Sequence, residues 1–145
     1  MMKKFAVGLS IFIGIVSCKK SEPISVVPQI EFVSVTPQNV HQFTDSLVFK
    51  ISYKDGDGDL GENNSNAENF FLTDSRNNVT YKFRIPQLAP DNANIIIQGN
   101  LNITLDNTSI IGSSSSETFT YSIYVKDRAG NQSNTVTSSQ VTVVQ

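Results

Sequence analysis

The residues best suited to chemistry lie in one stretch, Tyr53-Lys54-Asp55-Gly56-Asp57-Gly58-Asp59-Leu60-Gly61-Glu62. Three aspartates alternate with glycine there, so their carboxylates are held close together. Carboxylates at short distance repel each other, and loss of water makes each charge less favourable. A hard dication with oxygen ligands relieves both effects, and Ca²⁺ suits such a donor set. The stretch therefore predicts a calcium site.

An exposed turn is the simpler interpretation, because Asp-Gly is a common hairpin dipeptide. Two Asp-Gly pairs in succession, followed by Asp59 and Glu62, favour the metal site over the turn. The stretch does not fit an EF-hand loop. With Asp55 as the first position, Leu60 stands where that loop has glycine and Asn66 stands where it has glutamate.

Two segments of strict alternation must position these carboxylates. Residues 47–53 and 119–125 carry large apolar side chains at every second position. This period indicates strands with one buried face. Asp55 and Asp127 each continue the buried phase beyond the last apolar residue of their segment. We expect both carboxylates to face the interior where the strands end.

The chain from residue 29 onward has short strand patterns separated by turn signals and shows no helical periodicity. This predicts an all-β fold, a single seven-stranded immunoglobulin-like β-sandwich over residues 29–145. A small β-barrel or jelly roll is the alternative. The expected strands cover residues 30–35, 47–53, 70–72, 79–85, 95–105, 119–125 and 136–144.

In such a sandwich the second and sixth strands face each other across the core, and the loops that follow them leave at the same end. Asp127 is therefore expected beside the acidic stretch, as is the loop that holds Asp91. Ca²⁺ takes six to eight oxygen ligands. The expected ligands are Asp55, Asp57, Asp59, the carbonyl of Leu60, Glu62 and Asp127, with the carbonyl of Asn131 as a further candidate.

The first 17 residues are typical of a bacterial signal peptide: a basic start precedes an apolar run over residues 5–16. That run is shorter than the roughly 20 residues of a membrane-spanning helix. It ends in Ile15-Val16-Ser17-Cys18, which resembles a lipobox, and Cys18 is the only cysteine. We expect residues 1–17 to be removed and Cys18 to carry a lipid anchor. An ordinary signal peptide with a chance cysteine is the alternative.

Residues 18–28 are polar and contain two prolines, which predicts a tether between the anchor and the domain. Lys19 follows the cysteine, where an aspartate would favour retention in the inner membrane. We therefore expect attachment to the outer membrane, on its periplasmic face or at the cell surface.

The pairing of the acidic stretch with Val125-Lys126-Asp127-Arg128-Ala129-Gly130-Asn131 resembles small lipoproteins of Bacteroidota that carry an immunoglobulin-like domain. The resemblance covers residues 1–145 and implies the β-sandwich and the lipid anchor. The function of those lipoproteins is largely unknown, so the resemblance implies no activity. Cadherins similarly bind Ca²⁺ at the ends of sandwiches, but their linker motifs are absent from this chain.

Composition narrows the function further. With 11 basic and 13 acidic residues, the chain offers no positive field for nucleic acid. One His, one Cys and no Trp leave no set for a zinc site or a Cys–His pair. His41 is expected to be a solvated loop residue. We expect a non-catalytic, calcium-stabilised structural or adhesion module with an unknown protein or glycan partner. A carbohydrate- or ligand-binding accessory lipoprotein of an outer-membrane uptake system is the alternative, and a small hydrolase ranks last.

Overall fold

A computed structural model describes residues 24–145, which form an all-β domain without a helix. The expected signal peptide, Cys18 and the first part of the expected tether lie outside the described residues. The strands are β1 (Gln29–Thr36), β2 (Asn39–His41), β3 (Leu47–Asp55), β4 (Phe70–Asp74), β5 (Thr80–Phe83), β6 (Ile97–Leu105), β7 (Ser116–Phe119), β8 (Tyr121–Val125), β9 (Val136–Thr137) and β10 (Val141–Val144).

Alternation along the sequence explains the central strands. In β3, Leu47, Phe49 and Ile51 are fully buried, while the residues between them face outward. In β8, Tyr121 and Ile123 are buried in the same way. A strand with one apolar face must cover that face with another layer. The period-two pattern in the sequence therefore predicts correctly which face of each strand is buried.

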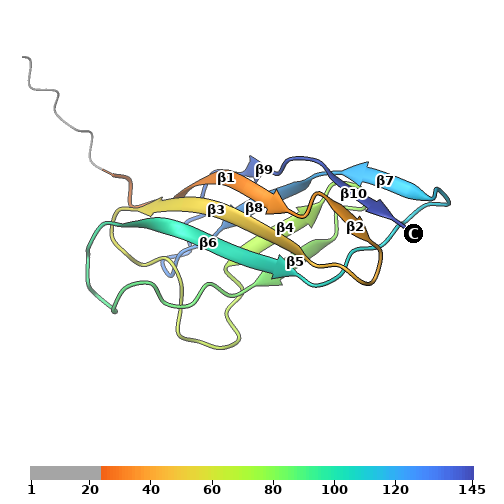
Figure 1. Cartoon of the computed structure of the whole chain (residues 1–145). Helices are drawn as coiled ribbons and strands as arrows, with labels where there is room; N and C mark the ends of the chain where they lie inside the picture. Colours follow the sequence, from red (N-terminus) through yellow and green to blue (C-terminus); the bar gives the residue numbers. More distant parts are fainter. Residues whose placement is uncertain (1–23) are drawn as a thin grey trace, which may run out of the picture.

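The strands form three sheets in the orders β1-β3-β6, β2-β10-β7 and β5-β4-β8-β9. The sheet that contains β3 packs against the one that contains β8: the rings of Phe49 and Tyr121 meet edge to face with centroids 5.0 Å apart. One continuous apolar core lies between them. In Figure 1, β3 and β6 run together along one side of the molecule, and β4 and β8 lie behind them.

The segmentation differs from the seven expected strands. The sixth expected strand is divided into β7 and β8 at Thr120, and the seventh into β9 and β10 at residues 138–140. Ser138 fills the second break, because its N–H donates to the Tyr121 carbonyl and its hydroxyl accepts from the Tyr121 N–H. The segment holding His41 was expected to be a loop but forms the short strand β2, parallel to β10.

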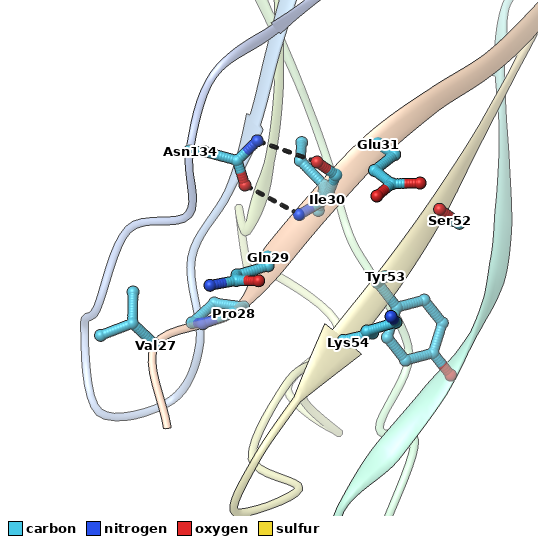
Figure 2. A pocket seen from close by; sticks show the side chains of 9 residues that line it. All are labelled: Val27, Pro28, Gln29, Ile30, Glu31, Ser52, Tyr53, Lys54 and Asn134. Carbon is cyan, nitrogen blue, oxygen red and sulfur yellow. Dashed lines mark hydrogen bonds between the residues drawn. The ribbon is translucent and has the colours of Figure 1, made fainter. Parts of the chain in front are cut away.

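The outer edge of β1 is closed by a side chain rather than by a strand. The Asn134 carboxamide accepts from the Ile30 N–H at 2.9 Å and donates to the Ile30 carbonyl at 2.8 Å. Figure 2 shows both bonds beside a pocket that is lined by the start of β1, the end of β3, with which it pairs, and Asn134. An unpaired strand edge can pair with other chains, and Asn134 blocks this part of it.

One end of the domain is held by an ion pair that the sequence analysis did not identify. Arg76 binds Asp74 and Glu117 at 2.7 Å each, and its guanidinium lies 3.4 Å from the centroid of the Phe119 ring. Asp74 is fully buried. A buried carboxylate needs such a partner. This arrangement is structural, because bonds to neighbouring residues occupy the guanidinium.

Candidate functional site

Asp55 is the last residue of β3 and pairs with Ile97 of β6. Its exposed fraction is 0%, which confirms that it follows the buried phase of the strand. The chain then turns through an irregular loop, residues 56–62, in which Asp57 and Asp59 follow at alternate positions. The strand therefore fixes the first carboxylate at the boundary of the core, and the loop carries the other two.

Asp55, Asp57 and Asp59 come together as the sequence predicts. Each offers a carboxylate oxygen, and these oxygens all lie within 4.8 Å of one another. The Oδ1 atoms of the three residues are buried and have no hydrogen-bond partner among the described residues. A buried polar atom without a partner is unfavourable, and three beside one another are more so. A cation bound among them would satisfy all three.

The second oxygen of two of these carboxylates is held by the backbone. The Leu60 N–H donates to Asp55 Oδ2 at 2.9 Å, and the Ala129 N–H donates to Asp59 Oδ2 at 3.1 Å. These bonds fix the orientation of the side chains and leave the Oδ1 atoms free. Such orientation of ligating carboxylates by further hydrogen bonds is usual around metal ions.

The electrostatics of the group favour a cation. Burial, followed by the charges of Asp57, Asp59 and Asp127, raises the pKa of Asp55 from 3.8 to about 6 despite the bond from Leu60. Burial and the charge of Asp127 likewise raise the pKa of Asp59. Desolvation and like charges are the two effects that disfavour an ionised carboxyl group. A dication would reverse both.

Glycine is required between the aspartates because other segments cross the loop there. A side chain on Gly56 would meet the carbonyl oxygens of Ile24 and Ser25, each 2.6 Å from the position of its Cβ. A side chain on Gly58 would meet the Ile95 carbonyl at 2.6 Å, and the φ of Gly58 is +78°. The loop is thus covered by the residues before β1 on one side and by those before β6 on the other. Residues 24 and 25, at the end of the expected tether, lie against the domain.

Asp127 lies beside the three-carboxylate group but is not one of its members. It faces Leu60 in an isolated antiparallel bridge, and its exposed fraction is 7%. Asn131 donates to both of its oxygens, from the backbone at 2.7 Å and from the side chain at 2.9 Å. The structure therefore brings the β8–β9 loop to the acidic loop, as predicted, with Asn131 as a partner of Asp127.

Glu62 is likewise outside the three-carboxylate group. Its N–H donates to the Ile85 carbonyl, and its own carbonyl accepts from Arg84, so its backbone is tied to the end of β5 and the residues after it. Glu62 thus lies beside the residues that follow β5. Leu60, whose carbonyl was predicted as a ligand, is fully buried in the core.

An open depression lies outside the carboxylate group. Asp57 and Asp59 line it, together with the β5–β6 loop and the β8–β9 loop, and the full lining is Asp57, Asp59, Asp91, Asn92, Ala93, Asn94, Arg128 and Ala129. Asp55 is not part of the lining and closes the inner side of the group. Figure 1 shows the loops that follow β3 and β8 and the loop before β6 at the end of the molecule where residue 24 lies, while the C-terminus is at the other end.

The sequence analysis missed three residues of this depression. Arg128 is fixed there by a bond to the Gly61 carbonyl at 2.7 Å, and its Nε lies 3.8 Å from Asp91. Asn92 and Asn94 have φ values of 60° and 42°. Asparagine tolerates this backbone region better than most residues. The loop that holds Asp91 was expected beside the acidic stretch, and the structure places it there, but its turn signal did not single out Asn92 or Asn94.

His41 lies on β2, in a different sheet from β3, and its Nδ1 is 3.1 Å from Asp45 Oδ2. Its side chain is 68% exposed, in agreement with the expected solvated histidine.

Comparison with known proteins adds no assignment: family models, curated proteins and solved structures were searched, and none matches the chain. Within residues 24–145, no helix has the length and apolar character needed to cross a membrane. The fold and the site together define an all-β domain with a buried carboxylate group at one end. The candidate function therefore rests on the chain's own residues.

Proposed function

We propose that this chain is a non-catalytic, lipid-anchored module whose β-domain is stabilised by Ca²⁺ bound at Asp55, Asp57 and Asp59. The anchor is the lipid expected on Cys18, and the expected location is the outer membrane. The module has a structural or adhesive role, with the ion fixing the loop that follows β3 at one end of the domain.

One observation supports the proposed ion site most directly: three buried Oδ1 atoms without hydrogen-bond partners lie together. Stable domains pair nearly all buried polar atoms, so a group of three unpartnered atoms needs a ligand. The donors are all oxygen, which favours Ca²⁺ or Mg²⁺ over zinc or copper. The irregular loop provides no octahedral frame, and Ca²⁺ accepts flexible geometry with higher coordination numbers.

The strand order supports the finer architecture, an immunoglobulin-like sandwich. In one layer β1, β3 and β6 correspond to the first, second and fifth expected strands. In the other, β4 pairs with β8, which correspond to the third and sixth. In the immunoglobulin fold, too, the second and sixth strands lie in different sheets. The parallel pairing of β2 with β10 belongs to the third sheet, β2-β10-β7.

Thermal unfolding of the purified protein in Ca²⁺ and in EDTA tests the proposal. A ligand that binds only the folded state stabilises it by about 2.7 kcal/mol at 100 times its Kd. We expect the midpoint to rise with Ca²⁺ and to fall with chelator. In the Asp57→Asn variant the rise should be lost, whereas Asp106→Asn, a change at an exposed residue after β6, should keep it. An unfolding midpoint that is the same with Ca²⁺ and with EDTA would refute the proposed calcium site.

A further inference from the structure

We propose that the ion held by Asp55, Asp57 and Asp59 binds a vicinal diol of a saccharide in the depression formed by the β5–β6 and β8–β9 loops. This inference rests on the proposed calcium site and adds the ligand that the site takes.

The position of the carboxylates leaves one side of the ion open. Asp55 is fully buried and closes the inner side, whereas Asp57 and Asp59 also line the depression. Backbone N–H groups hold Oδ2 of Asp55 and of Asp59, so the three carboxylates supply about three or four of the six to eight oxygens that Ca²⁺ takes. The remaining positions face the depression, where a ligand from solvent can enter.

The charges favour a neutral ligand over an anion. Three carboxylates outweigh a dication, and Asp91 adds a further negative charge to the depression. Arg128 is the one basic residue in the lining, and its Nε lies 3.8 Å from Asp91. A carboxylate or phosphate would therefore approach like charges, which disfavours binding. Hydroxyl groups coordinate a hard cation as neutral oxygen donors and avoid this repulsion.

The lining can also hydrogen-bond a polyol. The side-chain amides of Asn92 and Asn94 make no hydrogen bond within the described residues, and each amide offers both a donor and an acceptor. The loop that carries them is set by a turn, in which the Ala93 N–H donates to the Pro90 carbonyl at 3.2 Å. No aromatic side chain lines the depression, so stacking on a sugar ring is not offered there. Binding must therefore depend on the ion.

Two measurements test whether the ion is open and whether it takes a diol. Luminescence lifetimes of bound Tb³⁺ in H₂O and D₂O count the water molecules on the ion. We expect about two to five waters, since three or four carboxylate oxygens leave that many of the six to eight positions unfilled. A glycan array read with Ca²⁺ should show binding to saccharides that present free vicinal hydroxyls, and the binding should be lost in EGTA. A bound ion without water, or an array without a calcium-dependent hit, would overturn the inference.

Matched variants separate this inference from the calcium site itself. Asn92→Gly and Asn94→Gly keep the positive φ and remove one amide each. Loss of one hydrogen bond should weaken saccharide binding by about 3- to 10-fold. The midpoint shift with Ca²⁺ should not change. Asn78→Gly makes the same substitution at a φ of 59° in the β4–β5 turn, outside the depression, and should alter neither quantity.

The outcomes are distinct for the two proposals. If Ca²⁺ raises the midpoint but neither asparagine variant alters glycan binding, the saccharide inference is wrong and the calcium site stands. If Ca²⁺ leaves the midpoint unchanged, both are wrong.

Discussion

Replacing Asp55 with asparagine should change stability in opposite directions with and without Ca²⁺. Without the ion, the Asp55 carboxylate is fully buried, has one unpartnered oxygen and lies beside other negative charges. Asparagine has nearly the same shape and no charge. Its carbonyl can keep the bond from the Leu60 N–H, and its amide can donate to the free oxygens of Asp57 and Asp59. We therefore expect Asp55→Asn to stabilise the metal-free protein.

The size of this effect follows from the pKa of the buried group. Burial and neighbouring charges raise the pKa of Asp55 from 3.8 to about 6. A tenfold change in proton affinity is about 1.4 kcal/mol, so ionisation in the folded state is opposed by at most about 3 kcal/mol. For a domain of this size that limit corresponds to about 10 °C in the midpoint. We expect a rise of about 4–10 °C at neutral pH in EDTA, allowing for partial relaxation of the loop.

With Ca²⁺ the order should reverse. The wild-type protein gains the free energy of ion binding, whereas the variant has lost the ligand that closes the inner side of the site. Calcium titrations of the midpoint for the two proteins should therefore cross, and differential scanning calorimetry provides the measurement. Asp106→Asn is the matched control and should follow the wild-type curve. If Asp55→Asn lowers the midpoint in EDTA, the acidic group is not under the electrostatic strain inferred here.

The same group sets a pH dependence in the absence of divalent ions. The folded pKa of Asp55 lies above its ordinary value, so the folded protein holds this proton more tightly than the unfolded chain. The resulting stability is fully present below pH about 4 and is lost as the pH rises through about 6. Hydrogen bonds lower the pKa values of Asp45 and Glu117, which act in the opposite direction. The informative quantity is the stability advantage of Asp55→Asn over wild type, which should grow between pH about 4 and 6 without divalent ions and should reverse in Ca²⁺.

Two further pairs of variants test the packing of the domain by thermal or urea unfolding. Gly58→Ala should cost about 3 kcal/mol, because the new Cβ meets the Ile95 carbonyl and the residue has a positive φ. Gly130 also has a positive φ, +88°, but no neighbour lies within 4 Å of its Cβ position, so Gly130→Ala should cost about 1 kcal/mol. Equal losses would contradict the close contact above Gly58. Arg76→Ala should cost about 3–5 kcal/mol because it leaves the buried Asp74 carboxylate without its cationic partner, although the N–H of residue 76 still donates to it. Arg84→Ala, which removes an exposed bond to the Glu62 carbonyl, should cost no more than about 1 kcal/mol. An Arg76→Ala variant as stable as wild type would show that the guanidinium is dispensable.

The sequence predicted the parts of the site that depend on strand phase. Alternation in residues 47–53 placed Asp55 on the buried face, and its exposed fraction of 0% agrees. The same argument placed Asp127 near the acidic loop, and the bridge between Leu60 and Asp127 confirms the convergence of the two loops. These predictions succeeded because strand periodicity is local and burial depends on it directly.

The details within the loops could not be predicted from the same pattern. No local sequence pattern indicates that the carbonyls of Ile24 and Ser25 lie against Gly56. The same is true of the Ile95 carbonyl, which lies against Gly58. Such contacts join residues far apart in the sequence, and only the assembled domain determines them. The Arg76 ion pair was missed for the same reason, because Glu117 and Phe119 belong to β7, which is distant from Arg76 in the sequence. The break at Ser138 was also missed, since its hydroxyl replaces a backbone bond that alternation assumes.

The hydrogen bonds of Asp127 decide how this residue acts on the ion. Both of its oxygens accept from Asn131, and it lies outside the group of three carboxylates whose oxygens converge. Its charge still reaches them, because it raises the pKa values of both Asp55 and Asp59. Asp127 therefore strengthens the attraction for a cation without being one of its three ligands. It also fixes the β8–β9 loop through Asn131. That loop in turn donates the Ala129 N–H to Asp59, so charge and orientation reach the ion site from the same turn.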